Sequence, residues 1–437
     1  MSATGSLRST VAANRRGERA GITSICSADP SVLEAAVARA LEDGSLVCIE
    51  ATCNQVNQFG GYTGKTPADF RASVVSIAAS AGLPESRVAL GGDHLGPWVW
   101  QDEPAASAMA KARDLVRDYV LAGFTKIHLD ASMRCADDPG DPAAFLDEEI
   151  ATARTAELCR VAEDAHATLP QGSPPPAYVI GTEVPTPGGE RADREAPSVT
   201  RAEDVERTIA LARGAFEREG LQAVWERVIA VVTQPGVEFG DDVVFDYEPE
   251  RARELSAFIE RAEGLVYEAH STDYQTAATL TRMVEDHFAI LKVGPWLTFA
   301  MREALFALEC IEGELLADRD DVEPSRLREV LETTMVRHPE HWSSYYRGDE
   351  ARLRLARAFS YSDRCRYYWP RPELREARAR LVENLSERPI PLTLLAQFLP
   401  TGYEAVRAGA VAARPEELVR FKIAEVLDRY AAACGTG

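Results

Sequence analysis

The sequence is short of positive charge and has no long apolar run. Its 437 residues carry 48 Lys and Arg against 69 Asp and Glu, a formal net charge of −21. Such a chain repels nucleic-acid phosphates and anionic lipid, so we expect neither nucleic acid nor a membrane as a partner. No apolar stretch approaches the roughly 20 residues of a membrane span, and the first twenty residues lack the apolar centre of a signal peptide. We therefore expect a cytoplasmic protein.

Several cofactor and metal motifs are also missing. The eight cysteines are scattered, with no C-x-x-C pair, so the sequence indicates neither a zinc knuckle nor a disulfide framework and favours reduced thiols. No G-x-G-x-x-G follows a strand at the head of a helix, which argues against a bound dinucleotide. The glycine-rich run Gly60–Gly64 lacks a G-K-[ST] ending at the spacing of a phosphate loop.

What the sequence does contain is a regular alternation of strand-like and helix-like segments. Eight short runs rich in β-branched and small residues predict strands at Gly21–Ser27, Leu46–Thr52, Arg87–His94, Lys126–Ser132, Tyr178–Val184, Val228–Gln234, Leu265–Ser271 and Ala289–Pro295. Helical spacing separates them and follows the last, at Ser31–Leu41, Pro67–Ala81, Ala105–Ala122, Asp147–Ala167, Arg201–Glu219, Pro249–Ala262, Tyr274–Glu285 and Leu297–Ile311. Eight such units predict a (β/α)8 (TIM) barrel, although a doubly wound open sheet gives a similar alternation.

The sequence changes character after about residue 315. Arg-, Glu- and Leu-rich helical segments follow, with aromatic clusters at Trp342–Tyr346 and Tyr367–Trp369 and no further strand run. We therefore predict three parts: a flexible N-terminal segment at 1–20, the barrel at 21–314, and a helical appendage at 315–437 packed on the barrel.

Polar residues stand at nearly every predicted strand end. Enzymes with this fold build their sites at the carboxyl ends of the strands, and charged groups there have to be solvated or paired. The residues are Glu50, Asn54, Asp93, His94, Asp130, Glu183, Gln234, His270, Asp273 and Lys292. This coincidence favours a functional site over an inert barrel.

Three of these residues predict a metal site. His94, Glu183 and His270 come from three different strands, and imidazole with carboxylate is the ligand chemistry of divalent transition metals. The alternative is a set of hydrogen-bonding residues that hold a polyol substrate.

Eight stretches carry a resemblance to a known family. They are CSADPSVLEAA (26–36), IEATCNQVNQFGGYTGKTPADF (49–70), LGGDHLGPWVWQ (90–101), AGFTKIHLDASMRCADDP (122–139), IGTEVPTPGG (180–189), EAHSTDYQ (268–275), LKVGPWLTFAMREALFALE (291–309) and YSDRCRYYW (361–369). The sequence resembles the non-catalytic subunit family of class II tagatose-1,6-bisphosphate aldolase, which includes related tagatose 6-phosphate 4-epimerases. The likeness runs from about residue 21 to beyond 400.

The resemblance implies a barrel related to class II aldolases, a role in ketohexose phosphate metabolism and a divalent metal, whether Zn, Mn, Ni, Co or Mg. It maps the base and one metal ligand onto Asp93 and His94, and a later ligand onto His270. The aldolase pattern has another ligand His near the last strand, where this sequence has Lys-Val-Gly-Pro. Glu183 or Asp130 must then complete the site, or the site is absent.

A ketose substrate gives these residues a chemistry. A metal beside the C2 carbonyl stabilises an enediolate, and a carboxylate that takes the C4 hydroxyl proton allows retro-aldol cleavage between C3 and C4. Re-addition to the turned aldehyde inverts C4. We expect Asp93 or Glu50 as the base and Asp130 as a further catalytic group. Lys292 either stabilises developing negative charge or forms a structural ion pair.

Substrate binding is expected in three places. Asn54 and Gln55 lie in a polar glycine-rich loop that suits sugar hydroxyls, although such a loop is also an ordinary turn. Phosphate is expected at the loops after the last two strands or at arginines of the appendage, which otherwise tie the appendage to the barrel. The predicted substrate-binding residues are Asn54, Gln55, Gln234, Ser271, Asp273, Arg364 and Arg366.

Two classes of function remain from the sequence. The first is a metal-dependent 4-epimerase, an isomerase acting on hexulose phosphates, or an aldolase-type lyase. The second is a non-catalytic protein that stabilises a catalytic class II aldolase subunit. The row of polar strand ends favours the enzyme, and we expect it to form a homo-oligomer.

Overall fold

Eight parallel strands close into a barrel, and this closed sheet positions everything else. The structure is a computed structural model that describes residues 2–141, 145–181 and 197–436. Around the barrel the strands run in the order β1, β10, β9, β6, β5, β4, β3, β2. They are β1 (Ile22–Cys26), β2 (Val47–Thr52), β3 (Val88–Leu95), β4 (Lys126–Leu129), β5 (Ala177–Ile180), β6 (Val228–Thr233), β9 (Val266–Ala269) and β10 (Ile290–Val293). Six lie within a predicted strand, and β3 and β5 extend one residue beyond theirs, so the (β/α)8 prediction is confirmed.

Helices form the outer ring because each presents one apolar stripe to the sheet. They are α2 (Pro30–Asp43), α3 (Pro67–Ala81), α4 (Ala105–Leu121), α5 (Glu148–Ala167), α6 (Ala202–Arg218), α7 (Pro249–Ile259) and α8 (Ala277–Glu285). Their starts follow local chemistry: Asp29 caps α2, and Thr66 with Asp69 forms a reciprocal capping box on α3. Short 3-10 turns lie at η1 (Glu85–Arg87), η2 (Trp98–Trp100) and η3 (Gln222–Arg227).

An N-terminal helix closes the bottom of the barrel. Helix α1 (Ala3–Arg15) buries Leu7 and Val11 against residues from the amino-terminal ends of the strands, such as Ile22. Asn14 fixes the helix end by donating to the carbonyl oxygen of Val284 at 2.8 Å. The flexible segment expected at 1–20 is therefore corrected: most of it is a helix with a buried apolar face.

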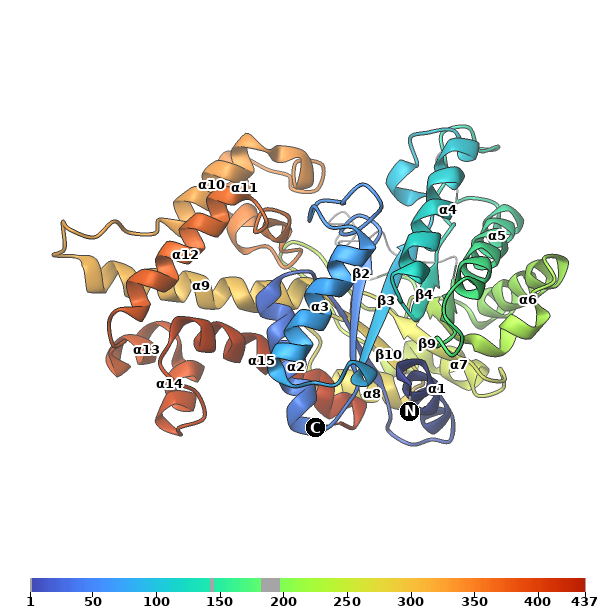
Figure 1. Cartoon of the computed structure of the whole chain (residues 1–437), viewed down its shortest axis with the longest axis horizontal. Helices are drawn as coiled ribbons and strands as arrows, with labels where there is room; N and C mark the ends of the chain where they lie inside the picture. Colours follow the sequence, from blue (N-terminus) through green and yellow to red (C-terminus); the bar gives the residue numbers. More distant parts are fainter. Residues whose placement is uncertain (1, 142–144, 182–196, 437) are drawn as a thin grey trace.

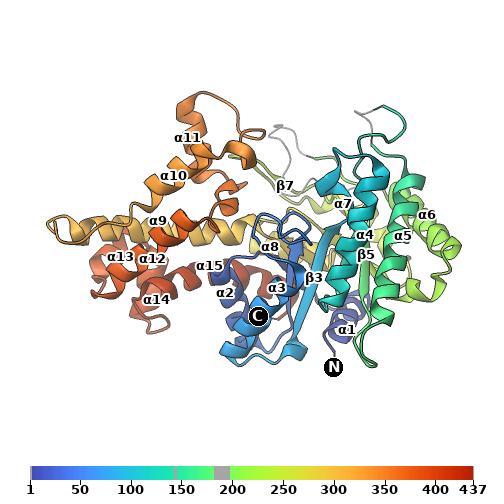
Figure 2. The same ribbon diagram turned by 45° about the horizontal axis from the view of Figure 1, so that its top comes forward.

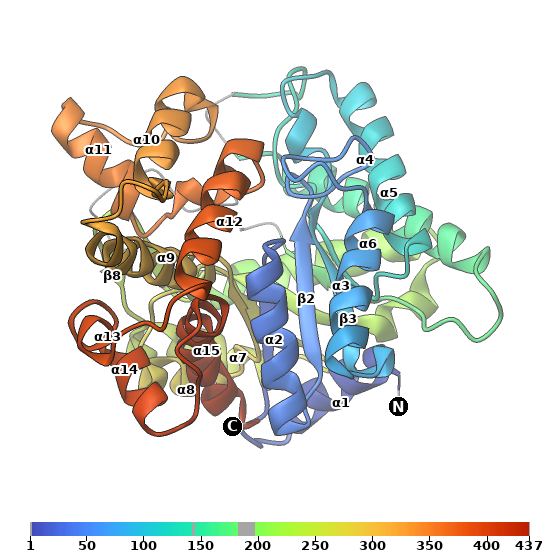
Figure 3. The ribbon, with the colours of Figure 1, turned by 60° about the vertical axis from the view of Figure 1, so that its left-hand side comes forward.

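The appendage is helical, as expected, but its last helix belongs to the barrel wall. Helix α9 (Pro295–Leu316) starts at the barrel and runs away from it, and the five helices that follow it gather around its far half (Figure 1). Helix α15 (Pro415–Cys434) then returns and packs on α2, α8 and α9 (Figure 3). The intervening elements are α10 (Leu327–Arg337), η4 (Pro339–His341), α11 (Glu350–Phe359), η5 (Arg364–Tyr367), α12 (Pro372–Ser386), α13 (Leu392–Phe398) and α14 (Pro400–Arg407).

A short hairpin links the mouth of the barrel to the appendage. Strands β7 (Glu238–Phe239) and β8 (Val244–Phe245) pair antiparallel in the segment after β6 (Figure 2). The backbone N–H of Tyr361 donates to the carbonyl oxygen of Asp241 at the hairpin turn, at 3.0 Å. Across the described ranges, none of the helices combines the length and apolar character needed to traverse a bilayer.

Candidate active site

Polar side chains fill the upper part of the barrel in two layers. The strand register aligns Glu50 of β2 and Lys126 of β4 with Gly91 of β3, and Lys126 forms ion pairs with Glu50 (2.5 Å) and Glu268 (2.7 Å). This lower layer is fully buried. Its glycine is required, because a Cβ at Gly91 would lie 2.6 Å from the Glu50 side chain.

The upper layer lies two residues further along the strands, at the carboxyl-terminal mouth. It contains Asp93, His128, His270 and Lys292, with His94 and Asp130 at its rim, all buried. Lys292 forms an ion pair with Asp93. Such a cluster of charges inside a barrel costs folding free energy unless each group is paired, so it has the character of a functional site.

An unusual backbone conformation lets two consecutive residues enter the same layer. Along a regular strand, Asp93 and His94 would point to opposite faces. His94 instead has φ 50°, and the pairing of β3 with β4 shifts register between Gly92 and Leu95. A positive φ is strained for a non-glycine residue and is found where function requires it. The following Gly96 passes so close to the Asp130 carbonyl that any Cβ would overlap it.

Each of the three imidazoles has one nitrogen held by a carboxylate. His94 Nδ1 lies 2.8 Å from Asp130, His128 Nδ1 lies 2.9 Å from Asp93, and His270 Nε2 lies 3.0 Å from Glu268. The ring centroids are 5.1 to 5.4 Å apart. This arrangement orients the rings, and the second nitrogen of His94, Nε2, lies 3.7 Å from Asp93.

The protonation of the cluster follows from burial and from its ion pairs. Burial lowers the pKa of His128 and of His270 to about 4, so both rings are neutral at neutral pH. Burial alone would raise the pKa of Glu268, but the charge of Lys126 and the hydrogen bond from His270 hold it well below its usual range. In the same way, His94 lowers the pKa of Asp130 against the effect of burial.

The donor set fits a divalent metal. Asp93, His94, His128 and His270 each offer an atom within 4.8 Å of the others. The buried Nε2 of His128 has no hydrogen-bond partner among the described residues. The two layers bury four carboxylates, of Glu50, Asp93, Asp130 and Glu268, against two ammonium groups, of Lys126 and Lys292, and this excess of acidic groups favours a bound cation.

The structure unites most, but not all, of the predicted catalytic and metal residues. His94 and His270 meet beside Asp93 and Lys292. Asp130 holds His94 and also accepts from the backbone and side chain of Ser132, so it orients a ring and is not part of the four-residue donor set. Glu50 belongs to the lower layer. Glu183 lies outside the described residues.

Sequence reasoning missed His128, Lys126 and Glu268. The third imidazole, sought near β10, comes instead from β4. A usable signal was present, because Lys126, His128 and Asp130 alternate with the apolar Ile127 and Leu129 in a buried strand, which aims all three polar residues at the barrel interior. Glu268 and His270 show the same two-residue spacing.

The glycine-rich loop between β2 and α3 is wound tightly on itself. Asn57 Oδ1 accepts from the backbone N–H groups of Phe59 and Gly61, and the N–H of Tyr62 donates to the Asn54 carbonyl. Gly61 has φ 54°, and a Cβ there would lie 2.4 Å from the Gln55 carbonyl oxygen. Backbone N–H groups used in this way do not form a nucleotide phosphate loop, in agreement with the sequence.

The predicted substrate-binding residues have varied surroundings. Gln55 Oε1 accepts from the Thr52 backbone and the Cys26 thiol, and Asn54 accepts from the Thr52 hydroxyl. Gln234 Oε1 accepts from the N–H of Gly236. Ser271 follows His270 with φ 53°.

The other three predicted substrate-binding residues make different contacts near the barrel mouth and in the appendage. Asp273 Oδ1 accepts from the N–H groups of Gly294 and Trp296 and so caps α9. Arg364 donates to the His341 carbonyl oxygen at 3.0 Å and stacks on Tyr345 within the appendage. Arg366 donates to the carbonyl oxygens of Ser362 and Asp363 and to the Tyr367 hydroxyl, and it lines a pocket with Gln55 and Tyr62.

The closed barrel and this buried His-carboxylate cluster define the chain as a (β/α)8-barrel protein with a polar centre at the carboxyl ends of its strands. A family model described as "D-tagatose-1,6-bisphosphate aldolase subunit GatZ/KbaZ-like" matches residues 7–435. The chain therefore belongs to this family, as the sequence motifs indicate, and is related to the tagatose-bisphosphate aldolases.

One solved structure is similar to the chain over nearly its whole length. A Sinorhizobium meliloti 1021 protein, described as a probable tagatose 6 phosphate kinase, is 46% identical, covers 95% of this chain and 100% of its own, and superposes with a TM-score of 0.86. The YdjI aldolase of Escherichia coli K12 is 14% identical, with coverages of 72% and 87% and a TM-score of 0.41. A Campylobacter jejuni fructose-bisphosphate aldolase is 13% identical, with coverages of 89% and 93% and a TM-score of 0.48. The last two are too distant to support an argument.

Proposed function

We propose that the chain is a metal-dependent ketohexose-phosphate 4-epimerase that interconverts tagatose 6-phosphate and fructose 6-phosphate through retro-aldol and aldol steps. The observation that carries the proposal is the upper layer of the barrel. Three carboxylate-held imidazoles surround one point, and the Asp93–Lys292 ion pair lies beside it. A barrel with a purely supporting role gains nothing from burying this many charges.

His94, His128 and His270 would hold the metal, with Asp93 beside them. When bound, a divalent metal polarises the ketose carbonyl and stabilises the enediolate charge. An imidazole-rich set suits Zn, Co, Ni or Mn better than Mg, which prefers oxygen ligands. Asp130 and Glu268 each hold one nitrogen of His94 and of His270, and Asp93 contacts His128 from within the donor set, so the rings are oriented before substrate arrives.

Asp93 is the proposed base that removes the C4 hydroxyl proton. It lies at the mouth in the same layer as the imidazoles, whereas Glu50 is one layer deeper and ion-paired with Lys126. Lys292 touches Asp93 and is placed to stabilise negative charge during cleavage. Burial lowers the pKa of Lys292, which makes its ammonium a readier proton donor.

Retro-aldol epimerisation requires that both fragments stay in the site while the aldehyde turns. Tyr62, from the loop after β2, packs edge-on against Tyr367 of the appendage, with ring centroids 4.6 Å apart. The barrel mouth is thus roofed partly by the appendage, which restricts the escape of fragments and the entry of water.

The second candidate is a non-catalytic subunit that stabilises a class II tagatose-1,6-bisphosphate aldolase. The family description favours it, because that description names a subunit.

The purified chain alone separates the two candidates. We expect fructose 6-phosphate to form from tagatose 6-phosphate when Zn, Co, Ni or Mn is supplied, and to stop after treatment with a chelator. The Asp93→Asn variant is the matched control, because it keeps the fold and removes the base. If no product forms with any metal, while the chain raises the thermal stability of a catalytic aldolase subunit, the supporting role is correct.

A further inference from the structure

A pocket of about 310 Å³ lies between the barrel mouth and the appendage. Three segments that are distant in sequence form its walls: the turn after β1 at 26–30, the loop at 55–65 and the appendage at 366–378. Its floor adjoins the proposed active site through Cys26. This residue ends β1 beside Glu50 of β2; burial raises the pKa of its thiol to about 11, and the nearby charges of Lys292 and Arg366 oppose the shift.

The pocket is strongly cationic in a protein of net charge −21. Lys65, Arg366, Arg375 and Arg378 line it, against one carboxylate, Asp29. Arg378 lies 3.2 Å from Asp29 and neutralises it, so three positive charges remain for a ligand. Local concentration of one charge sign against the overall charge of the molecule marks an anion site.

The hydrogen-bonding groups of the wall indicate the same kind of ligand. Trp369 lines the pocket, and its buried indole nitrogen has no hydrogen-bond partner among the described residues. An indole nitrogen only donates, so this group lacks an acceptor in the described structure. Guanidinium groups and a lysine together match the several oxygens of a phosphoryl group better than a single neutral acceptor.

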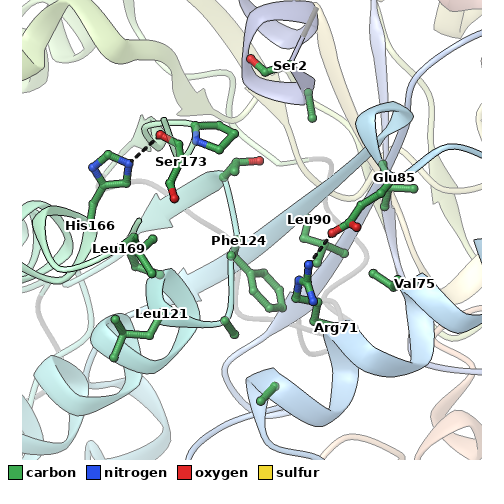
Figure 4. Close-up of a pocket in the computed structure, with 18 of the residues that line it drawn as sticks. Ser2, Arg71, Val75, Glu85, Leu90, Leu121, Phe124, His166, Leu169 and Ser173 are labelled. Carbon is green, nitrogen blue, oxygen red and sulfur yellow. Dashed lines mark hydrogen bonds and ion pairs between the residues drawn. The ribbon is translucent and has the colours of Figure 1, made fainter. Parts of the chain in front are cut away.

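A larger cavity, of about 680 Å³, lies at the opposite end of the barrel and lacks these features (Figure 4). Its charged residues Arg71 and Glu85 form an ion pair with each other, and the ring of His166 bonds to the carbonyl oxygen of Ser173 at 3.2 Å. The rest of its wall is mainly apolar, with Leu121 and Phe124 among the lining residues.

We propose that the pocket between barrel and appendage binds the phosphoryl group of the substrate, with Lys65, Arg366 and Arg375 as its cationic ligands. The identity of the sugar rests on the proposed function, whereas the anion site rests on the pocket itself. The appendage is then part of the substrate site, because two of these three cations come from it. Because the free sugar has no phosphoryl group for these cations to bind, the pocket would select the phosphorylated sugar.

The test is calorimetric titration with inorganic phosphate, which needs no turnover. Lys65→Gln and Arg375→Gln are the chosen variants, because Lys65 only donates to Ser73 and Arg375 is exposed at the rim. Arg380→Gln, on the same helix but outside the pocket, is the matched control. We expect each pocket variant to raise the Kd for phosphate about tenfold, the loss of roughly one charge-assisted hydrogen bond, and the control to leave it unchanged.

Competition identifies the source of the phosphoryl group. Tagatose 6-phosphate should displace inorganic phosphate from the wild-type chain, and free tagatose should not. Equal phosphate affinity in wild type and both pocket variants would overturn the proposal, and so would the absence of phosphate binding to the wild type. Phosphate binding in this pocket by a chain that does not epimerise would refute the proposed function while leaving the anion site in place.

Discussion

At the scale of single residues, His128 is the member of the proposed metal site that also contacts the proposed base, Asp93. Its Nδ1 lies 2.9 Å from Asp93, and its buried Nε2 lacks a partner in the described structure. Replacing it with Ala removes one of three imidazoles and leaves Asp93 without this hydrogen bond. The fold should tolerate the small cavity that the change leaves at the mouth of the barrel.

We expect His128→Ala to bind at least tenfold less Zn or Mn than the wild type. Loss of a residue that only orients a metal ligand already lowers metal affinity by about tenfold or more, and loss of a ligand itself should lower it further. The measurement is metal content after dialysis, with far-ultraviolet circular dichroism to confirm folding. His166→Ala is the control, since His166 lies at the opposite end of the barrel. Undiminished metal content in His128→Ala would show that the metal, if bound, sits elsewhere.

Asp273 gives a second prediction at this scale, about pH. Burial raises its pKa to about 6, although the N–H groups of Trp296 and Gly294 oppose the shift. An ordinary aspartate has a pKa near 3.9, so the folded state binds the extra proton between about pH 4 and 6. Stability from this group is therefore present at low pH and is lost as pH rises through about 6.

Asp273→Asn keeps an oxygen acceptor for both N–H groups and removes the buried charge. The wild type should lose about 1 kcal/mol of unfolding free energy relative to this variant between pH 5 and pH 7. Urea midpoints at the two pH values measure the difference. Asp69→Asn is the control, because Thr66 lowers the pKa of Asp69 and it does not titrate in this range. A parallel pH dependence of wild type and Asp273→Asn contradicts the assignment.

At the scale of elements, helix α1 has a purely structural role. Leu7 is fully buried beneath the barrel, at the end opposite the His-carboxylate cluster. Leu7→Ala should therefore lower the unfolding free energy by about 3 kcal/mol, the usual cost of a cavity of this size, with little change in kcat/KM of the folded enzyme. Denaturant unfolding measures the first quantity. The exposed neighbour Arg8→Ala should change neither, and wild-type stability of Leu7→Ala would show that α1 does not seal the barrel.

The sequence predicts the elements of the barrel well and the site only in part. All eight strands were expected because buried parallel strands form apolar runs between helices with clear amphipathic spacing. Helix α1 was not expected, since Leu7 and Val11 are its only large apolar residues and give little periodic contrast. The two-residue hairpin strands are too short to show a pattern.

The sequence predicts only some of the site residues. Asp93, His94 and His270 stand at strand ends, where the sequence pointed to them. His128 and Glu268 lie inside strands, where alternation with apolar residues indicates that they face the barrel interior, but the residues that they meet there depend on the register of neighbouring strands. The positive φ of His94 and the distance between barrel and appendage are likewise tertiary properties. Nothing in the local sequence determines them.

At the scale of the whole molecule, the proposed mechanism requires the barrel and appendage together to confine two fragments. If C4 inverts by cleavage of the C3–C4 bond, the intermediates are an enediolate and glyceraldehyde phosphate, held beneath the contact between Tyr62 and Tyr367. Some escape is expected. The purified chain should release traces of glyceraldehyde phosphate and dihydroxyacetone from fructose 6-phosphate, at rates far below epimerisation.

The hydrogen on C4 decides between this route and direct proton transfer. That hydrogen stays on its carbon throughout retro-aldol cleavage, so epimerisation in D2O should place no deuterium at C4 of the product, as measured by NMR. Asp93→Asn should abolish epimerisation and fragment release together, because both begin with removal of the C4 hydroxyl proton. Asp69→Asn, on the outer face of α3, should retain both activities. Deuterium at C4 would contradict the retro-aldol route. Fragment release that persists in Asp93→Asn would instead give Asp93 the later task of guiding the turned aldehyde back to the enediolate.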